Sequence, residues 1–202
     1  MATGMLGSDA LAEVAGPFKD FSEKLGSSEG PMWFSAFKRF LRKENPWALK
    51  FVRQMTLTIG GVSKDVLAKR LKDGGHSIFD WARNIMGKSS FTTLPEPFEI
   101  ELGWITVRDL GFSSKPTTEE LFARIKEVGD LCPAEVGPHL LLADADQQCG
   151  TCYWVAMEPI ADSGGRPLVF DVKRRGVGRQ WLYAFYAYPR GRWFLDDILV
   201  VR

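Results

Sequence analysis

The chain has 202 residues, of which 45% are apolar, 25% charged and 12% aromatic. This is the composition of a folded domain with a sizeable core, and it excludes general disorder. The net charge of +1 gives the whole chain no strong attraction to nucleic acid or to an anionic membrane. No apolar run approaches the roughly 20 residues that a membrane-spanning helix needs.

The N-terminus and the cysteines indicate where the protein works. Residues 1–30 carry acids and glycines but no basic segment that leads into an apolar run, so we do not expect a secretory signal. The chain has three cysteines, and an odd number argues against a disulfide framework. We therefore predict a soluble, cytoplasmic protein without a membrane partner.

The sequence predicts two parts of unequal size. Residues 1–30 are rich in Gly, Ser and Ala, which is typical of a flexible N-terminal segment. Residues 31–202 are predicted to form a single α+β domain. Within it we expect a helical part over about residues 31–95 and a sheet-rich part over about residues 96–202.

In the helical part, the spacing of apolar residues predicts a helix over residues 31–42 and a strand over residues 53–59. Two further helices are predicted over residues 63–73 and 77–86. Ser63 suits the N-cap of the first of these two.

In the sheet-rich part, Thr117 and Glu120 match a capping box and predict a helix over residues 118–128. Apolar patterns predict strands over residues 98–107, 140–142, 152–157, 168–172, 180–188 and 193–201. Short turns between successive strands favour antiparallel pairing. The predicted fold class is therefore α+β, with N-terminal helices packed on a mainly antiparallel β-sheet. The core is expected to include Trp81, Ile85, Leu121, Ile125, Leu142, Val155, Met157, Phe170, Leu182, Phe185 and Val200.

Two stretches carry a resemblance to known proteins: Cys-Pro-Ala-Glu-Val-Gly-Pro over residues 132–138 and Ala-Met-Glu-Pro-Ile over residues 156–160. The chain resembles a family of small bacterial proteins of uncharacterised function over about its last 150 residues. The resemblance implies no activity, ligand or catalytic residue. Members have a turn like Pro-Lys-Gly-Glu where this chain has Gln-Cys-Gly-Thr over residues 148–151, which makes the CxxC peculiar to this chain.

The CxxC formed by Cys149 and Cys152 can be a redox pair or half of a zinc site, with Cys132 and His139 as further ligands. The sequence has no second CxxC, and the motif enters a predicted strand rather than a helix. The alternative is one cysteine in a turn and one in a buried strand. We predict neither a metal nor a cofactor.

A constrained loop is predicted around Glu135, because prolines at positions 133 and 138 stiffen the backbone there. Side chains that converge on this loop would form a rigid polar binding pocket. Its candidate residues are Glu135, His139, Gln147, Glu158 and Asp162. The alternative is that Glu135 accepts backbone N–H bonds and only holds the loop in place.

A basic stretch over residues 173–179 is predicted to be a hairpin tip that can hold phosphates. Its candidate nucleic-acid contacts are Lys173, Arg174, Arg175 and Arg179. The aromatic residues that can stack on bases beside it are Trp181, Tyr183, Phe185 and Tyr186. The helical pair over residues 63–86 has the outline of a helix-turn-helix and can add contacts. The alternatives are a solvated turn and a packed helical pair.

No hydrolase, nuclease, phosphate-loop or dinucleotide motif is present in the sequence, and no catalytic residue is predicted. The leading hypothesis is a non-enzymatic binding or regulatory module with a protein partner. The second is a nucleic-acid-binding protein that uses residues 63–86 and 173–179. The third is a metal-dependent hydrolase or nuclease that uses Glu135, His139 and Asp146.

Overall fold

The computed structural model describes residues 8–43, 49–174 and 180–202. Its contacts divide the chain into two compact units, Met1–Ala48 and Leu49–Arg202. The predicted division between residues 30 and 31 therefore falls inside the first unit rather than between the two.

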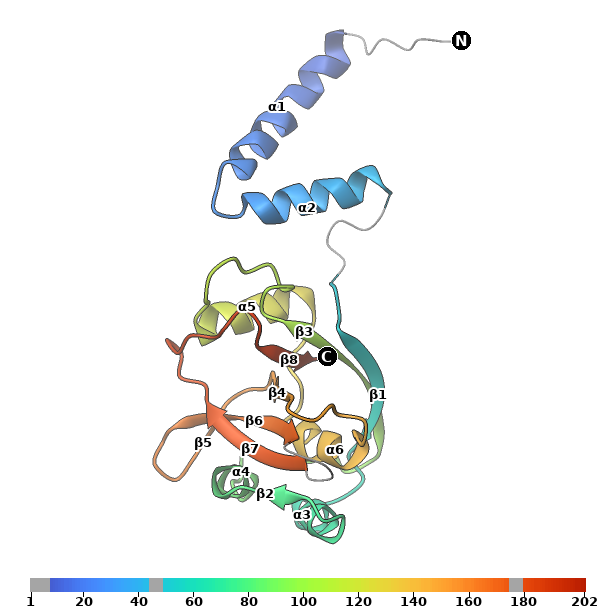
Figure 1. Ribbon diagram of the computed structural model, residues 1–202, viewed down its shortest axis with the longest axis vertical. Coiled ribbons are helices and arrows are strands. Elements are labelled where there is room, and N and C mark those ends of the chain that lie inside the picture. Colours follow the sequence, from blue (N-terminus) through green and yellow to red (C-terminus); the bar gives the residue numbers. More distant parts are fainter. Residues whose placement is uncertain (1–7, 44–48, 175–179) are drawn as a thin grey trace. The chain divides into compact units, whose positions relative to one another are not determined.

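Over residues 8–43, the described part of the first unit, there are two helices, α1 (Ser8–Leu25) and α2 (Gly30–Leu41) (Figure 1). They contact each other through Phe21 and Phe37, whose ring centroids lie 4.9 Å apart. The predicted helix over residues 31–42 is confirmed, with a proline in its first turn, where a backbone N–H has no helical partner. The segment predicted to be flexible, residues 1–30, thus contains all of α1, and its flexibility stays a prediction.

The second unit is built on one sheet, which has eight strands within the described residues. The strands are β1 (Arg53–Ile59), β2 (Ser77–Ile78), β3 (Phe98–Thr106), β4 (Cys152–Val155), β5 (Ile160–Ala161), β6 (Pro167–Arg174), β7 (Gln180–Tyr186) and β8 (Ile198–Val201). Their order is β1-β3-β8-β4-β6-β7-β2, and β5 pairs with β6 (Figure 1).

The α+β class is confirmed, but the sheet is mixed rather than mainly antiparallel. β4 pairs in parallel with β8, and β2 pairs in parallel with β7. The turn argument holds for strands that follow each other directly, such as β6 and β7. It fails for β8, because the last strand of the chain lies between β3 and β4, a long-range pairing that no turn residue signals.

Helices occur along the whole second unit, so they are not confined to its N-terminal part as predicted. They are α3 (Lys64–Asp73), α4 (Asp80–Met86), α5 (Thr118–Val128) and α6 (Val136–Ala143). α6 packs on β1, β6 and β7, and α3 packs on α6. Among the described residues, no helix combines the length and the apolar character needed to cross a bilayer.

The predicted helix starts are confirmed at two caps. The Ser63 hydroxyl accepts a hydrogen bond from the backbone N–H of Val66 at 3.4 Å. At α5, Thr117 Oγ1 accepts from Glu120 N at 3.2 Å, and Glu120 Oε2 accepts from Thr117 N at 2.7 Å. Local side-chain chemistry thus sets where both helices begin.

One predicted element is wrong in type, and another begins later than predicted. Residues 140–142 lie in α6, not in a strand, because a short apolar run fits a helix that is buried on all sides as well as a strand. The predicted helix over residues 77–86 begins only at Asp80. Its first two residues pair with β7 instead, as β2.

The predicted core is confirmed except at three positions. Leu142 is half-buried, Trp81 is 41% exposed and Phe185 is 47% exposed. Trp81 lies at the margin of the buried face of α4. Phe185 and Leu182 are three residues apart on one strand, and successive strand residues face opposite sides, so the two cannot share the core face.

Candidate functional site

The predicted polar pocket is only partly formed. Glu135 and His139 lie together at the start of α6, with 3.5 Å between Glu135 Oε2 and His139 Nε2. Glu135 Oε2 also accepts from Gly60 N at 3.1 Å, and Oε1 accepts from Leu94 N at 2.9 Å. This is the arrangement that the loop-holding alternative predicts, because the carboxylate joins the segment after β1 to the segment before β3.

Burial governs the charge of this pair. It raises the pKa of Glu135 despite the two backbone hydrogen bonds, which lower it. Burial also lowers the pKa of His139, and the positive charge of Arg70 lowers it further. Asp146, the third residue of the predicted hydrolase site, is exposed on the loop after α6, whereas Glu135 and His139 are buried.

The other three candidates lie on separate elements and bind different partners. Glu158 is exposed and forms an ion pair with Lys126 at 2.8 Å. Asp162 accepts hydrogen bonds within its own turn from Gly164 N and from Arg166, which lowers its pKa to about 2. Gln147 belongs to a third group, described next. The five residues therefore do not form one pocket, because Glu158, Asp162 and Gln147 lie apart from the Glu135–His139 pair and bind partners of their own.

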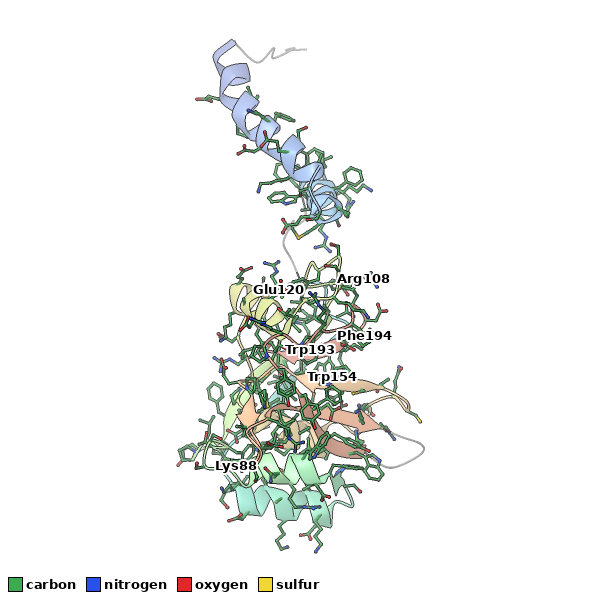
Figure 2. The ribbon with its side chains drawn as sticks, turned by 90° about the vertical axis from the view of Figure 1, so that its left-hand side faces the viewer. Lys88, Arg108, Glu120, Trp154, Trp193 and Phe194 are labelled. Carbon is green, nitrogen blue, oxygen red and sulfur yellow. The ribbon has the colours of Figure 1, made fainter. Side chains whose placement is uncertain are left out.

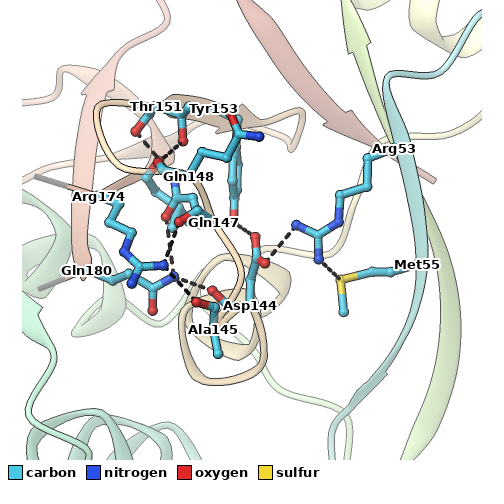
Figure 3. Close-up of polar contacts among 11 residues, drawn as sticks. Arg53, Met55, Asp144, Ala145, Gln147, Gln148, Thr151, Tyr153, Arg174 and Gln180 are labelled. Carbon is cyan, nitrogen blue, oxygen red and sulfur yellow. Dashed lines mark hydrogen bonds and ion pairs between the residues drawn. The ribbon is translucent and has the colours of Figure 1, made fainter. Parts of the chain in front are cut away.

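Gln147 belongs to a polar cluster centred on Asp144, which the sequence did not predict (Figure 3). Asp144 is buried just after α6, and its two carboxylate oxygens bind Arg53 Nη1 at 2.7 Å and Tyr153 OH at 2.8 Å. Gln180 donates to the Asp144 backbone carbonyl. The cluster therefore stabilises the fold, because it links the end of α6 to β1, β4 and β7.

The cysteines are free thiols in three different environments. Cys132 is buried and Cys149 is exposed, while Cys152 is half-buried at the start of β4. Burial raises the pKa of Cys132 and of Cys152 to about 12, which leaves few reactive thiolates. Among the described residues, no group of three or more His, Cys, Asp or Glu is placed to hold a metal ion. Cys149 lies in a turn and Cys152 in a strand, as the alternative to a metal or redox site predicts.

The described part of the basic stretch contacts the protein itself. Lys173 Nζ lies 2.7 Å from buried Asp171, and Arg174 Nη1 donates to the carbonyls of Ala145 and Gln147 at 2.7 and 2.6 Å. The other two predicted contacts, Arg175 and Arg179, lie outside the described residues. The two described cations are therefore held by internal partners.

The aromatic residues of β7 follow strand alternation. Trp181, Tyr183 and Phe185 share one face of the sheet, whereas Leu182 and Ala184 are buried on the other. The aromatic face is partly covered by Phe79, whose ring stacks on Tyr183 with 3.8 Å between centroids. On this face Trp181 and Tyr183 are half-buried, and Phe185 is exposed.

At the end of this face lies a pocket of about 320 Å³, which we call the aromatic pocket. Trp154 from β4 and Trp193 from the β7–β8 connection meet edge to face at 5.6 Å, and Phe194 stands beside them (Figure 2). The lining residues are Thr118, Trp154, Phe185, Tyr186, Tyr188, Gly191, Arg192, Trp193, Phe194 and Asp197.

Specific hydrogen bonds hold the pocket in shape. Trp193 Nε1 donates to Thr118 Oγ1 at 3.0 Å, which fixes the indole against the start of α5. Asp197 Oδ2 accepts from Phe194 N at 2.8 Å, which fixes the turn before β8. Burial raises the pKa of Asp197. The predicted strand over residues 193–201 is therefore wrong in its first half, because β8 starts at Ile198.

The second unit is an α+β domain that carries a concave aromatic pocket. Neither a family model, nor a curated protein, nor a solved structure matches this chain.

Proposed function

We propose that the protein is a non-enzymatic binding or regulatory module whose aromatic pocket receives an apolar side chain of a protein partner. The observation that supports this most is the concave group of aromatic rings at the end of β7. Aromatic rings supply a large apolar contact area, and their removal from water drives association.

The size of the pocket favours a side chain over a larger ligand. A volume of about 320 Å³ lies at the lower end of the ~300–1,000 Å³ typical of small-molecule sites. It accommodates one or two anchoring side chains of a peptide segment. The exposed rings at its rim then contact the flanking residues of that segment.

The composition of the pocket matches the energetic centres of protein interfaces, where Trp, Tyr and Arg are enriched. Phe194 is 60% exposed, Phe185 47% and Tyr188 44%. These rings are large apolar groups in contact with water, and a partner that covers them gains about 25 cal/mol per Å² of buried apolar surface.

The same lining favours binding over catalysis. It contains one carboxylate, Asp197, whose oxygen is already bonded to Phe194 N, and it contains neither a histidine nor a cysteine. A general acid and base pair is thus missing from the described lining. The free thiols support the further proposal of a cytoplasmic location.

A selection from a random peptide library displayed on phage tests this function. We expect the selected peptides to share one apolar anchor residue. Their affinity should fall at least tenfold for the double variant Phe185→Ala/Phe194→Ala, since interface anchors contribute about 1–2 kcal/mol or more each. Both side chains are exposed, so the fold should persist.

The matched control is Phe98→Ala, which removes another ring that is 53% exposed but lies outside the pocket. It should leave peptide affinity within twofold of the wild type. Equal peptide binding by the pocket variant and the wild type would refute the proposed site, as would a selection that yields no enriched peptide.

A further inference from the structure

A second concave surface lies between α3, β2 and α4, and none of its residues lines the aromatic pocket. This α3–α4 groove has a volume of about 640 Å³. Its lining residues are Lys64, Asp65, Ala68, Lys69, Lys72, His76, Ser77, Ile78, Arg83, Met86 and Gly87. The groove falls in the helical pair over residues 63–86, one of the two segments predicted to contact nucleic acid.

The rim of the groove is cationic. Four lining residues carry a positive charge and one, Asp65, a negative charge, so the lining has a formal excess of three positive charges. Lys69 pairs with Asp73 at 2.6 Å, with side chains 75% and 59% exposed. Such an exposed pair is worth about 0–1 kcal/mol, so an incoming anion can replace the carboxylate at little cost.

Lys72 is the most available of these cations. It is exposed one turn along α3 from Lys69, and within the described chain its side chain has no hydrogen-bond or ion-pair partner. Lys64 bonds two carbonyls at the end of α4, and Arg83 pairs with Asp80. Two lysines on one helix face therefore offer point charges suited to a phosphate.

The floor of the groove differs from its rim because it is apolar. Ala68 of α3, Ile78 of β2 and Met86 of α4 lie there, half-buried or buried. His76 adds a half-buried imidazole, and burial lowers its pKa, which favours the neutral ring. An apolar floor beneath a cationic rim fits a ligand with a flat, weakly polar part and an anionic part.

We propose that the α3–α4 groove binds a phosphorylated small molecule of the nucleotide class. Its phosphates bind Lys69 and Lys72, and its ring system covers Ile78 and Met86. The volume of about 640 Å³ is in the ~300–1,000 Å³ range of small-molecule sites, which favours a mononucleotide over a long strand. The proposal is independent of the function assigned to the aromatic pocket.

Isothermal titration calorimetry of the full chain with ATP, without added metal, tests this proposal. The test variant is Lys69→Gln/Lys72→Gln. The matched control is Lys50→Gln/Lys126→Gln, which removes the same charge from exposed positions outside the groove. We expect the test variant to weaken ATP affinity at least tenfold and the control to change it less than twofold.

Two further arms identify the source of the binding. The pocket variant Phe185→Ala/Phe194→Ala should bind ATP as the wild type does. Inorganic phosphate, titrated in the same way, should bind more weakly than ATP. The proposal is overturned if ATP does not bind at 1 mM, or if the groove and control variants bind equally. It is also overturned if a single-stranded 12-mer oligonucleotide binds in the groove while ATP does not.

Discussion

Asp144→Ala is expected to lower the free energy of unfolding by about 3 kcal/mol. The Asp144 side chain is fully buried and bonds both Arg53 and the Tyr153 hydroxyl. Removal of one partner from a buried ion pair typically costs ~3–5 kcal/mol. The Arg53 side chain is 36% exposed and can regain water, which places the loss near the lower end of that range. Urea unfolding followed by circular dichroism measures the change.

Asp146→Ala is the matched control, because Asp146 lies two residues further along the same loop and is exposed. Its substitution should change stability by less than about 0.5 kcal/mol. Tyr153→Phe should produce part of the Asp144→Ala loss, since it removes one of the two bonds. If the Asp144→Ala variant unfolds at the same urea concentration as the control, the cluster does not stabilise the fold.

Glu135→Ala is expected to lower the free energy of unfolding by about 2 kcal/mol. The change leaves the N–H groups of Gly60 and Leu94 without their carboxylate acceptor. Each bond to a charged acceptor is worth about 1.5–3 kcal/mol, and the cost of burying that carboxylate offsets part of the sum. Gly60 has a φ of 74° and lies against the backbone of Glu96, a conformation that few other residues can adopt. The Glu135 carboxylate therefore stabilises a turn with an unusual backbone conformation.

Glu158→Ala controls for the loss of a carboxylate as such. Glu158 is exposed in an ion pair with Lys126, so its substitution should cost at most about 1 kcal/mol. Both variants should keep the affinity for peptides selected on the wild type, measured at a temperature where they are folded. If Glu135→Ala abolished peptide binding without loss of stability, Glu135 would be a ligand contact rather than a loop tie.

The sequence predicts correctly those elements whose determining contacts lie within a few residues along the chain. The strand over residues 53–59 alternates, and Ser63 and Thr117 cap their helices through neighbours three residues away. The sequence predicts a strand over residues 140–142 of α6 because the apolar residues of this helix occupy every side and give no helical period. The place of β8 depends on partners far along the chain, which no short window contains.

The candidate site could be predicted only in part. The alternation of Trp181, Tyr183 and Phe185 in the sequence already gives one aromatic face on β7. The pocket itself needs Trp154 and Trp193 to meet, and they come from strands and turns some distance apart in the chain. The polar candidates failed as a group because the sequence does not show that buried or turn carboxylates already have backbone partners.

The most direct test of the binding function is affinity capture from the lysate of the protein's own cells, with tagged wild type and the Phe185→Ala/Phe194→Ala variant run in parallel. Each sample is split, and one half is treated with nuclease. We expect a protein partner that survives nuclease with the wild type and is lost with the variant. A partner retained equally by both, or a nucleic-acid load that vanishes with nuclease and leaves no protein, would rule out the proposed binding site.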